Sequence, residues 1–331
     1  MNLRRLAKSF SLATLAVFLF LSLSFLSLSC SEKKSPSSPS IKPPSSIPVT
    51  ELTLIRALPI EGVAGIEPSG LILYRNTLFS ISDDHDDTIY RLLLGDTCAI
   101  AEPHLRFSAP NGLLPLDFEG ITIDSSGNFY LVSETEFRIL RVSPNGEATW
   151  VTSSLREFGD AKGLFQKSNA HLEGIAYVDS SRFILCAERS PRGLLTIDVK
   201  HFPNNSAALS CDDTPFHIAP PRVPDFADVF FESGHLYALH RAADAISLMR
   251  VQNDSATEQR AWSFHATVSK PQYLYRDNQF GHAEGFCMDS EKIYVVLDNN
   301  NDSRQADASD RRSMLFIFQR PPALARLPDS P

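Results

Sequence analysis

The sequence predicts an all-β fold built from internal repeats, and two observations support this class. The dipeptide Glu-Gly precedes an apolar, strand-like stretch at Glu119, Glu173 and Glu284. The apolar stretches, such as residues 129–132 and 293–296, are short, rich in β-branched or aromatic residues, and bounded by turn-forming residues. Amphipathic helices require longer stretches with a different period, so helices do not explain the pattern.

The repeat defines the architecture. Aligning the chain on the Glu-Gly step gives equivalent positions that are 50, 54, 54 and 57 residues apart, namely Ser69, Glu119, Glu173, Ala227 and Glu284. A period near 50 residues with several short strands per copy is typical of a β-propeller, in which each copy forms one blade. We therefore predict a single propeller over residues 48–320 with five blades. Six blades are the alternative, because residues 153–170 and 299–313 could contain irregular strands.

Each copy predicts the same series of strands. First strands are expected at 119–124, 173–178 and 284–289, second strands at 128–133, 182–187 and 292–297, and third strands at 138–142, 194–198 and 314–319. Weaker outer strands are expected at 147–152 and 259–264. Residues 125–128 and 143–146 have the composition of hairpin turns.

The last copy lacks a fourth strand, because Pro321 and Pro322 follow its third strand. A missing outer strand would leave an unpaired sheet edge, which natural proteins avoid. Residues 50–58 are rich in β-compatible residues and precede the first copy. We expect this segment to fill the outer place of the last blade and so close the ring.

The N-terminus resembles a bacterial lipoprotein signal. Basic residues at Arg4, Arg5 and Lys8 precede an apolar run over residues 10–28, and Cys30 follows it. Residues 1–29 would be removed and Cys30 lipidated, although Ser27 stands where such signals usually carry Leu. A transmembrane anchor is the alternative, since the run is near the roughly 18 residues that suggest a span.

The segments that flank the propeller are predicted to be disordered. Residues 30–47 are rich in Ser, Pro and Lys and read as a tether, and residues 321–331 form a polar tail. Ser31 is compatible with sorting to the outer membrane in the lipoproteins that the signal resembles. We therefore expect a lipid-anchored, monomeric protein of the bacterial cell envelope, on the periplasmic or surface face of the outer membrane.

Composition limits the partners and the cysteine chemistry. The 331 residues are 43% apolar, enough for a substantial core, and the net charge of -8 argues against a nucleic-acid partner. Besides Cys30, the chain has Cys98, Cys186, Cys211 and Cys287, an even number that leaves disulfides open in an exported protein. Cys186 and Cys287 lie within predicted strands and read as buried thiols. No Cys/His spacing suggests zinc.

The repeat also predicts a site. First strands line the channel of a propeller, so Glu119, Glu173 and Glu284 are expected around one mouth as candidate catalytic residues. Second strands return to the same mouth and bring the candidate metal ligands Asp83, Asp84, Glu134, Glu188 and Asp298. Crowded carboxylates repel one another unless protons, cations or basic side chains compensate.

Three kinds of compensation are open. A hard cation such as Ca²⁺ could bind the carboxylates, with His171, His282 and Asp117 extending its ligand shell. Arg189, Arg192, Arg241 and Lys162 could neutralise them, and the three arginines are also candidates for binding substrate phosphate. Partial protonation is the third route.

A purely architectural role for the motif is the alternative to a site. Carboxylates could bond to the backbone of the next blade while Gly permits close approach at the axis. The replacement of Glu by Ser69 and Ala227 favours an asymmetric mouth, as a binding site would need. The acidic loops 82–87 and 298–302 could supply cation ligands or be solvated turns, and neither fits the EF-hand pattern.

The series of motifs resembles a known group of proteins. Residues 69–71 with 79–83, 117–121, 173–175 with 186–189, and 284–286 with 297–299 resemble the exported propellers called SdiA-regulated and those called esterase-like phytases. The resemblance covers most of residues 60–320. The phytase-like branch implies a hydrolase acting on small phosphoesters, typically with calcium; the SdiA-regulated branch implies a non-catalytic binding or scaffold propeller. The fourth copy departs from the pattern at His240 and Arg241. The chain lacks the motifs of serine hydrolases, P-loop enzymes and HExxH metalloproteases.

Overall fold

The computed structural model describes residues 47–111, 115–252 and 255–322, which belong to one compact unit of the chain over residues 44–331. The predicted signal segment, Cys30 and nearly all of the predicted tether lie outside the described residues. Within the described ranges, none of the helices has the length and apolar character needed to cross a membrane.

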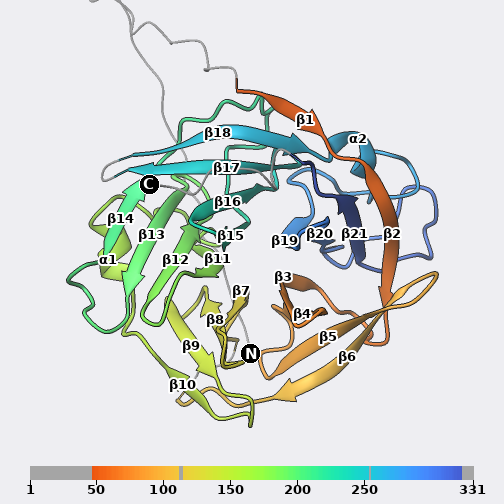
Figure 1. Cartoon of the computed structure of the whole chain (residues 1–331). Coiled ribbons are helices and arrows are strands. Elements are labelled where there is room, and N and C mark those ends of the chain that lie inside the picture. Colours follow the sequence, from red (N-terminus) through yellow and green to blue (C-terminus); the bar gives the residue numbers. More distant parts are fainter. Residues whose placement is uncertain (1–46, 112–114, 253–254, 323–331) are drawn as a thin grey trace, which may run out of the picture. The chain divides into compact units, whose positions relative to one another are not determined.

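The strands are arranged in groups of four around a common centre (Figure 1). One group contains β3 (Pro68–Tyr74), β4 (Thr77–Ser82), β5 (Thr88–Leu94) and β6 (Ala99–Arg106); the next contains β7 (Phe118–Ile123), β8 (Phe129–Ser133), β9 (Arg138–Val142) and β10 (Ala148–Trp150). They are followed by β11 (Leu172–Tyr177), β12 (Arg182–Ala187), β13 (Gly193–Asp198) and β14 (Ala207–Ser210), and by β15 (Asp228–Glu232), β16 (His235–His240), β17 (Ala245–Gln252) and β18 (Ser255–Ser263). The last group contains β19 (Ala283–Met288), β20 (Lys292–Leu297), β21 (Met314–Gln319) and the N-terminal strand β2 (Leu54–Glu61). The predicted all-β propeller class is confirmed.

Strand β2 closes the ring as the sequence predicts. It pairs antiparallel with β21 from Leu54 to Pro59, outside the third strand of the last group. It then pairs in parallel with β6 through Ile60 and Glu61, so the first and last groups form one eight-stranded sheet. The short strand β1 (Val49–Glu51) pairs in parallel with β18. The N-terminal segment thus holds three neighbouring groups together.

The two segments in which the sequence left extra strands open contain no named strand in the structure. Residues 153–170 contain the short helix α1 (Arg156–Asp160), and residues 299–313 contribute one isolated bridge, from Arg304 to Tyr275. Strand β14 and a second short helix, α2 (His265–Val268), follow no clear sequence signal and were not predicted.

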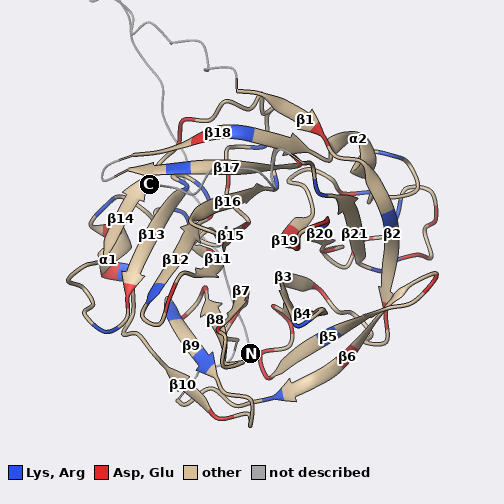
Figure 2. Cartoon of the chain, viewed as in Figure 1, with Lys and Arg blue, Asp and Glu red and all other residues tan. Residues whose placement is uncertain are grey.

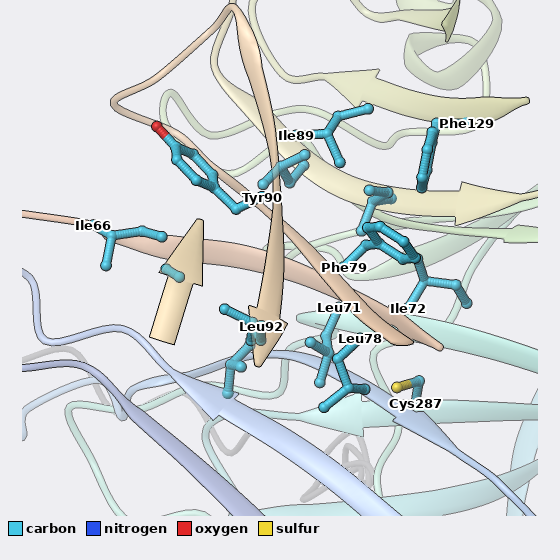
Figure 3. Packing of buried hydrophobic residues seen from close by; sticks show 14 of the residues in the cluster. Ile66, Leu71, Ile72, Leu78, Phe79, Ile89, Tyr90, Leu92, Phe129 and Cys287 are labelled. Atoms are coloured by element: carbon cyan, nitrogen blue, oxygen red, sulfur yellow. The ribbon is translucent and has the colours of Figure 1, made fainter. Parts of the chain in front are cut away.

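The core lies between the sheets, where apolar faces of neighbouring groups meet. In Figure 3, Leu71 and Ile72 of β3 and Phe79 of β4 pack with Phe129 of β8 on one side and Cys287 of β19 on the other. The four cysteines within the described residues are free. Cys186 and Cys287 are buried as predicted, and burial raises the pKa of both thiols well above its usual range.

Close packing of the inner strands explains why the repeated Glu-Gly dipeptide contains a glycine. A Cβ atom on Gly120 would lie 2.5 Å from the carbonyl oxygen of Glu173, and one on Gly174 would lie 2.5 Å from Cα of Asp228. A Cβ atom on Gly285 would lie 2.7 Å from the backbone of Gly70. A residue other than glycine would therefore force neighbouring inner strands apart.

Candidate functional site

Acidic side chains surround a cavity at one end of the ring. In Figure 2 the ribbon is coloured red for Asp and Glu at several places near the centre, close to β19, β3 and β7. The cavity has a volume of about 380 Å³. Its acidic lining residues are Glu67, Asp83, Asp117, Glu119, Glu134, Glu173, Glu188, Asp277, Glu284, Asp298 and Asp302. Two arginines, Arg189 and Arg241, also line it. The cavity therefore carries a large excess of negative charge if all of these groups ionise.

A bulge at the start of three inner strands positions the repeated glutamates. The pairing register shifts between Phe118 and Gly120 in β7, between Leu172 and Ile175 in β11, and between Ala283 and Gly285 in β19. A bulge leaves a residue out of the ladder and redirects its side chain. Glu119, Glu173 and Glu284 occupy these bulges, which is why their carboxylates reach the cavity instead of following the strand's alternation.

A repeated backbone hydrogen bond links the residue that follows each second strand to the residue two positions before the repeated glutamate. The backbone N–H of Glu134 donates to the carbonyl oxygen of Asp117, that of Glu188 to His171, and that of Asp298 to His282, each at 2.8 Å. In every case the acceptor lies two residues before the repeated Glu. This bond brings the two acidic positions of one group to the same mouth.

The fourth group reverses the charge of this arrangement. Arg241 directly follows β16, the place that Asp83, Glu134, Glu188 and Asp298 occupy in the other groups. Ala227 stands at the position of the repeated Glu. One group therefore contributes a cation where its neighbours contribute carboxylates.

Arg241 neutralises one side of the cavity. Its guanidinium forms ion pairs with Glu188 and Glu284, and its Nε lies 3.6 Å from Asp225. Burial lowers the pKa of Arg241, but the carboxylates around it, Glu284 first, raise that pKa above its ordinary value. Arg189 also pairs with Glu188 and donates to the carbonyl oxygen of Asn169 at 3.2 Å. On this side the arginines are already bound by the protein's own carboxylates.

The opposite side holds carboxylates with no such compensation. One oxygen each of Asp83, Asp117 and Glu119 lie within 4.8 Å of one another. In the described part of the chain, none of the three forms an ion pair. Burial and then neighbouring carboxylates raise the pKa of Asp83 to about 7 and that of Asp117 to about 6, and they raise the pKa of Glu119 well above its usual range. Carboxylate oxygens at this spacing suit a hard cation such as Ca²⁺.

Three further carboxylates have a buried oxygen without a partner among the described residues. These atoms are Glu188 Oε2, Glu284 Oε2 and Asp298 Oδ1. Glu284 and Asp298 are 7% and 5% exposed, and both line the cavity. Burial, followed by the charge of Glu284, raises the pKa of Asp298 to about 8. Since a buried polar atom without a partner is costly, these oxygens are candidate contacts for a ligand or a cation in the cavity.

The remaining predicted residues have other positions. Glu173 lines the cavity, and Glu134 accepts a hydrogen bond from the backbone N–H of His171 at 2.8 Å. Asp84 is exposed and does not line the cavity, and Lys162 is also exposed. His282 contacts the carbonyl oxygen of Asp277 at 2.6 Å through Nε2, so it supports a loop at the rim.

Arg192 lies away from the cavity. It is 1% exposed, donates to the carbonyl oxygen of Cys211 at 2.7 Å and forms an ion pair with Glu258 at 2.7 Å. Its guanidinium carbon stacks 4.4 Å from the ring centre of Phe226. The structure thus places Arg192 in the packing between two groups of strands, and not at the mouth where a substrate would bind.

Several cavity residues carry a weak signal in the sequence or none. Glu67 lies two residues before Ser69, as Asp117 does before Glu119, so the repeat alignment contains it. Asp302 belongs to the acidic loop 298–302, which the sequence indicates as a possible source of cation ligands, and it lines the cavity. Asp277 comes from a loop outside the repeat and has no equivalent in the other copies.

The charge balance around Arg241 predicts a stability effect. Arg241→Gln leaves Glu284 and Asp225 without their cation and leaves Glu188 with Arg189 alone, so we expect a loss of about 3 kcal/mol or more in the free energy of unfolding. Calcium should restore part of this loss by taking over the neutralisation. Urea unfolding with EDTA and with calcium measures both effects.

The matched control is Arg91→Gln, which breaks the exposed ion pair with Glu102 and should cost less than about 1 kcal/mol. Equal losses in the two variants would show that Arg241 has no special role.

The raised pKa of Asp298 predicts a pH dependence. With a pKa of about 8 in the folded state, the carboxyl keeps a proton that the unfolded chain loses near pH 4. The folded state therefore binds more protons, and stability falls as pH rises through about 7 to 9, where histidines are neutral in both states. We expect the Tm in EDTA to fall over this range, with a smaller fall for Asp298→Asn. Equal slopes for both proteins would contradict the assignment.

One of the solved structures compared with this chain shares its fold. A search of curated proteins gives no match. The crystal structure of glutaminyl cyclase from Myxococcus xanthus matches with a TM-score of 0.52 and 12% identity, over 82% of this chain and 97% of that one, which shows a shared fold alone. The PQQ-bound aldose sugar dehydrogenase from Streptomyces coelicolor matches with a TM-score of 0.44 and 14% identity, over 82% and 98%.

A family model identifies the chain more specifically. The model described as phytase-like, with the esterase-like activity of phytase, matches residues 59–301. The match begins within β2 and ends in the loop after β20, so it includes nearly all residues that line the cavity. The predicted resemblance to esterase-like phytases is confirmed, and the chain belongs to this phytase-like family.

Proposed function

We propose that the acidic cavity binds a divalent cation, with calcium as the best fit, and hydrolyses phosphoesters. The observation that carries this proposal is the cluster of Asp83, Asp117 and Glu119, next to the buried oxygens of Glu284 and Asp298 that lack partners. The family description, esterase-like activity of phytase, points to the same class of reaction.

The cation has a chemical reason in this cavity. A phosphate group is negative, and the cavity is lined by many more carboxylates than arginines. A phosphoester would be repelled unless positive charge is added. A cation held by Asp83, Asp117 and Glu119 would supply that charge against the phosphoryl oxygens and lower the pKa of water at the site.

The arginines divide into two roles. Arg241 is engaged with Glu188 and Glu284, so its role is to position these carboxylates. The side chain of Arg189 is 21% exposed and lies at the cavity, so it can contact a bound phosphoryl group from the same side. In the absence of a cation, burial raises the pKa of Asp298 to about 8, and this carboxyl lines the cavity where a leaving oxygen would need a proton.

Phosphate release from a panel of phosphoesters tests the activity. We expect the purified protein to hydrolyse at least one substrate with calcium and not with EDTA. Asp117→Asn and Glu119→Gln should lower kcat/KM by about a hundredfold or more, a loss of roughly 2.7 kcal/mol of transition-state stabilisation. The same variants should lose calcium binding in calorimetry.

Glu157→Gln, at an exposed position on α1, is the matched acid-to-amide control and should retain activity. Calcium binding without hydrolysis of any substrate would favour the second function, a non-catalytic propeller that binds an envelope ligand. That alternative has one observation in its favour: the protein's own carboxylates already pair with both arginines of the cavity.

We also propose that the chain is a lipoprotein anchored through Cys30 to the outer membrane. The support is the sequence alone, a basic start and an apolar run that ends at Cys30, followed by a polar tether. Incorporation of radiolabelled fatty acid into the protein expressed in a bacterium tests it. Cys30→Ser should abolish labelling, whereas Cys98→Ser should not; persistent label in Cys30→Ser would refute the anchor.

A further inference from the structure

An exposed phenylalanine stands at the rim of the acidic cavity. Phe280 is 52% exposed, and among the described residues that line the cavity it is the largest apolar side chain. The other large hydrophobic residues with high exposure, such as Leu94 and Val251, do not line this cavity. Phe280 therefore joins an apolar surface to an otherwise polar site.

The loop that carries Phe280 is fixed by contacts on both sides. Arg222 donates to the carbonyl oxygens of Asn278 at 2.8 Å and Gln279 at 3.2 Å. The backbone N–H of Asp277 donates to Asp302 at 2.5 Å. These bonds hold the backbone on the N-terminal side of Phe280, so the position of the ring follows from the loop's own structure.

Gly281 fixes the other side of the loop. Its φ of +91° is a left-handed conformation that favours glycine, and a Cβ atom there would lie 2.8 Å from the carbonyl oxygen of Arg241. The loop thus rests directly on the residue that positions Glu188 and Glu284. The loop that carries the phenylalanine ring therefore packs against a charged residue of the cavity.

This arrangement has the form of a site for a ligand with two chemically different ends. The carboxylates and a cation would hold the phosphoryl end, while an aromatic ring at the rim offers a face for a planar group. Since water would otherwise cover the exposed ring, a ligand that packs on it gains apolar burial as well as stacking.

We infer that Phe280 selects phosphoesters whose alcohol part carries a planar ring, by packing against that ring at the cavity rim. This inference rests on the proposed function for the phosphoryl end of the site. It adds a specificity residue and a substrate class, aryl or other planar-ring phosphoesters in preference to small acyclic ones.

Binding of two matched phosphonates tests the inference without requiring catalysis. Phenylphosphonate and methylphosphonate carry the same charged group and differ in the ring. Calorimetry with the calcium-loaded protein should show tighter binding of phenylphosphonate. Phe280→Ala should weaken phenylphosphonate by about tenfold and leave methylphosphonate within about twofold, whereas Phe280→Tyr should keep the preference. Leu94→Ala, an exposed apolar position away from the cavity, should change neither.

The outcomes separate this inference from the proposed function. The expected binding pattern without hydrolysis of any phosphoester would support the role of Phe280 and overturn the proposed enzyme. Hydrolysis with equal effects of Phe280→Ala on both phosphonates, or no preference for the phenyl group in the wild type, would overturn the inference and leave the enzyme standing. Failure of the calcium-loaded protein to bind either phosphonate would overturn both.

Discussion

The close approach of the inner strands is the constraint on which the site depends. Glycine at positions 120, 174 and 285 lets each strand lie against its neighbour at distances that a Cβ atom would forbid. The residue before each glycine is then forced into a bulge at the mouth of the ring. The repeat therefore places several glutamates close together, and their negative charges repel one another. Other groups at the mouth must compensate for this repulsion.

The solution is different on the two sides of the mouth. Arg241 takes the place of an acidic residue in the fourth group and pairs with Glu188 and Glu284. Within the described residues, Asp83, Asp117 and Glu119 form no ion pair with a basic side chain. Burial raises the pKa of all three carboxyl groups. One internal cation therefore converts a symmetric ring of carboxylates into a cavity with a neutralised side and a side that can accept an ion.

The sequence predicts what the repeat controls and fails where three-dimensional packing decides. The inner strands, the closing strand β2 and most cavity residues follow from the alignment of copies, because each copy repeats the same local geometry. Arg192 was predicted from its place beside Glu188, but it pairs with Glu258, 66 residues away, across two groups of strands. Phe280 and Asp277 come from a loop that occurs once, so no periodic pattern could indicate them.

The structure also distinguishes a carboxylate that serves the fold from one that serves a site. Asp228 is buried, with Oδ1 accepting the backbone N–H of Val229 at 2.8 Å and Oδ2 accepting that of Phe286 at 3.0 Å. Both of its oxygens are used by the backbone: Oδ1 holds the start of β15, and Oδ2 joins β15 to β19, as the architectural interpretation of the repeat requires.

Glu284 differs from Asp228 in the partners of its two carboxylate oxygens. One oxygen meets Arg241, and the other is buried with no partner among the described residues, although it lies on the cavity. If the repeated glutamate existed only to tie strands together, its second oxygen would find a backbone N–H, as that of Asp228 does. The glycine of the Glu-Gly pair therefore belongs to the architecture, whereas Glu284 keeps one oxygen at the cavity that is available to the ligand or cation that we propose.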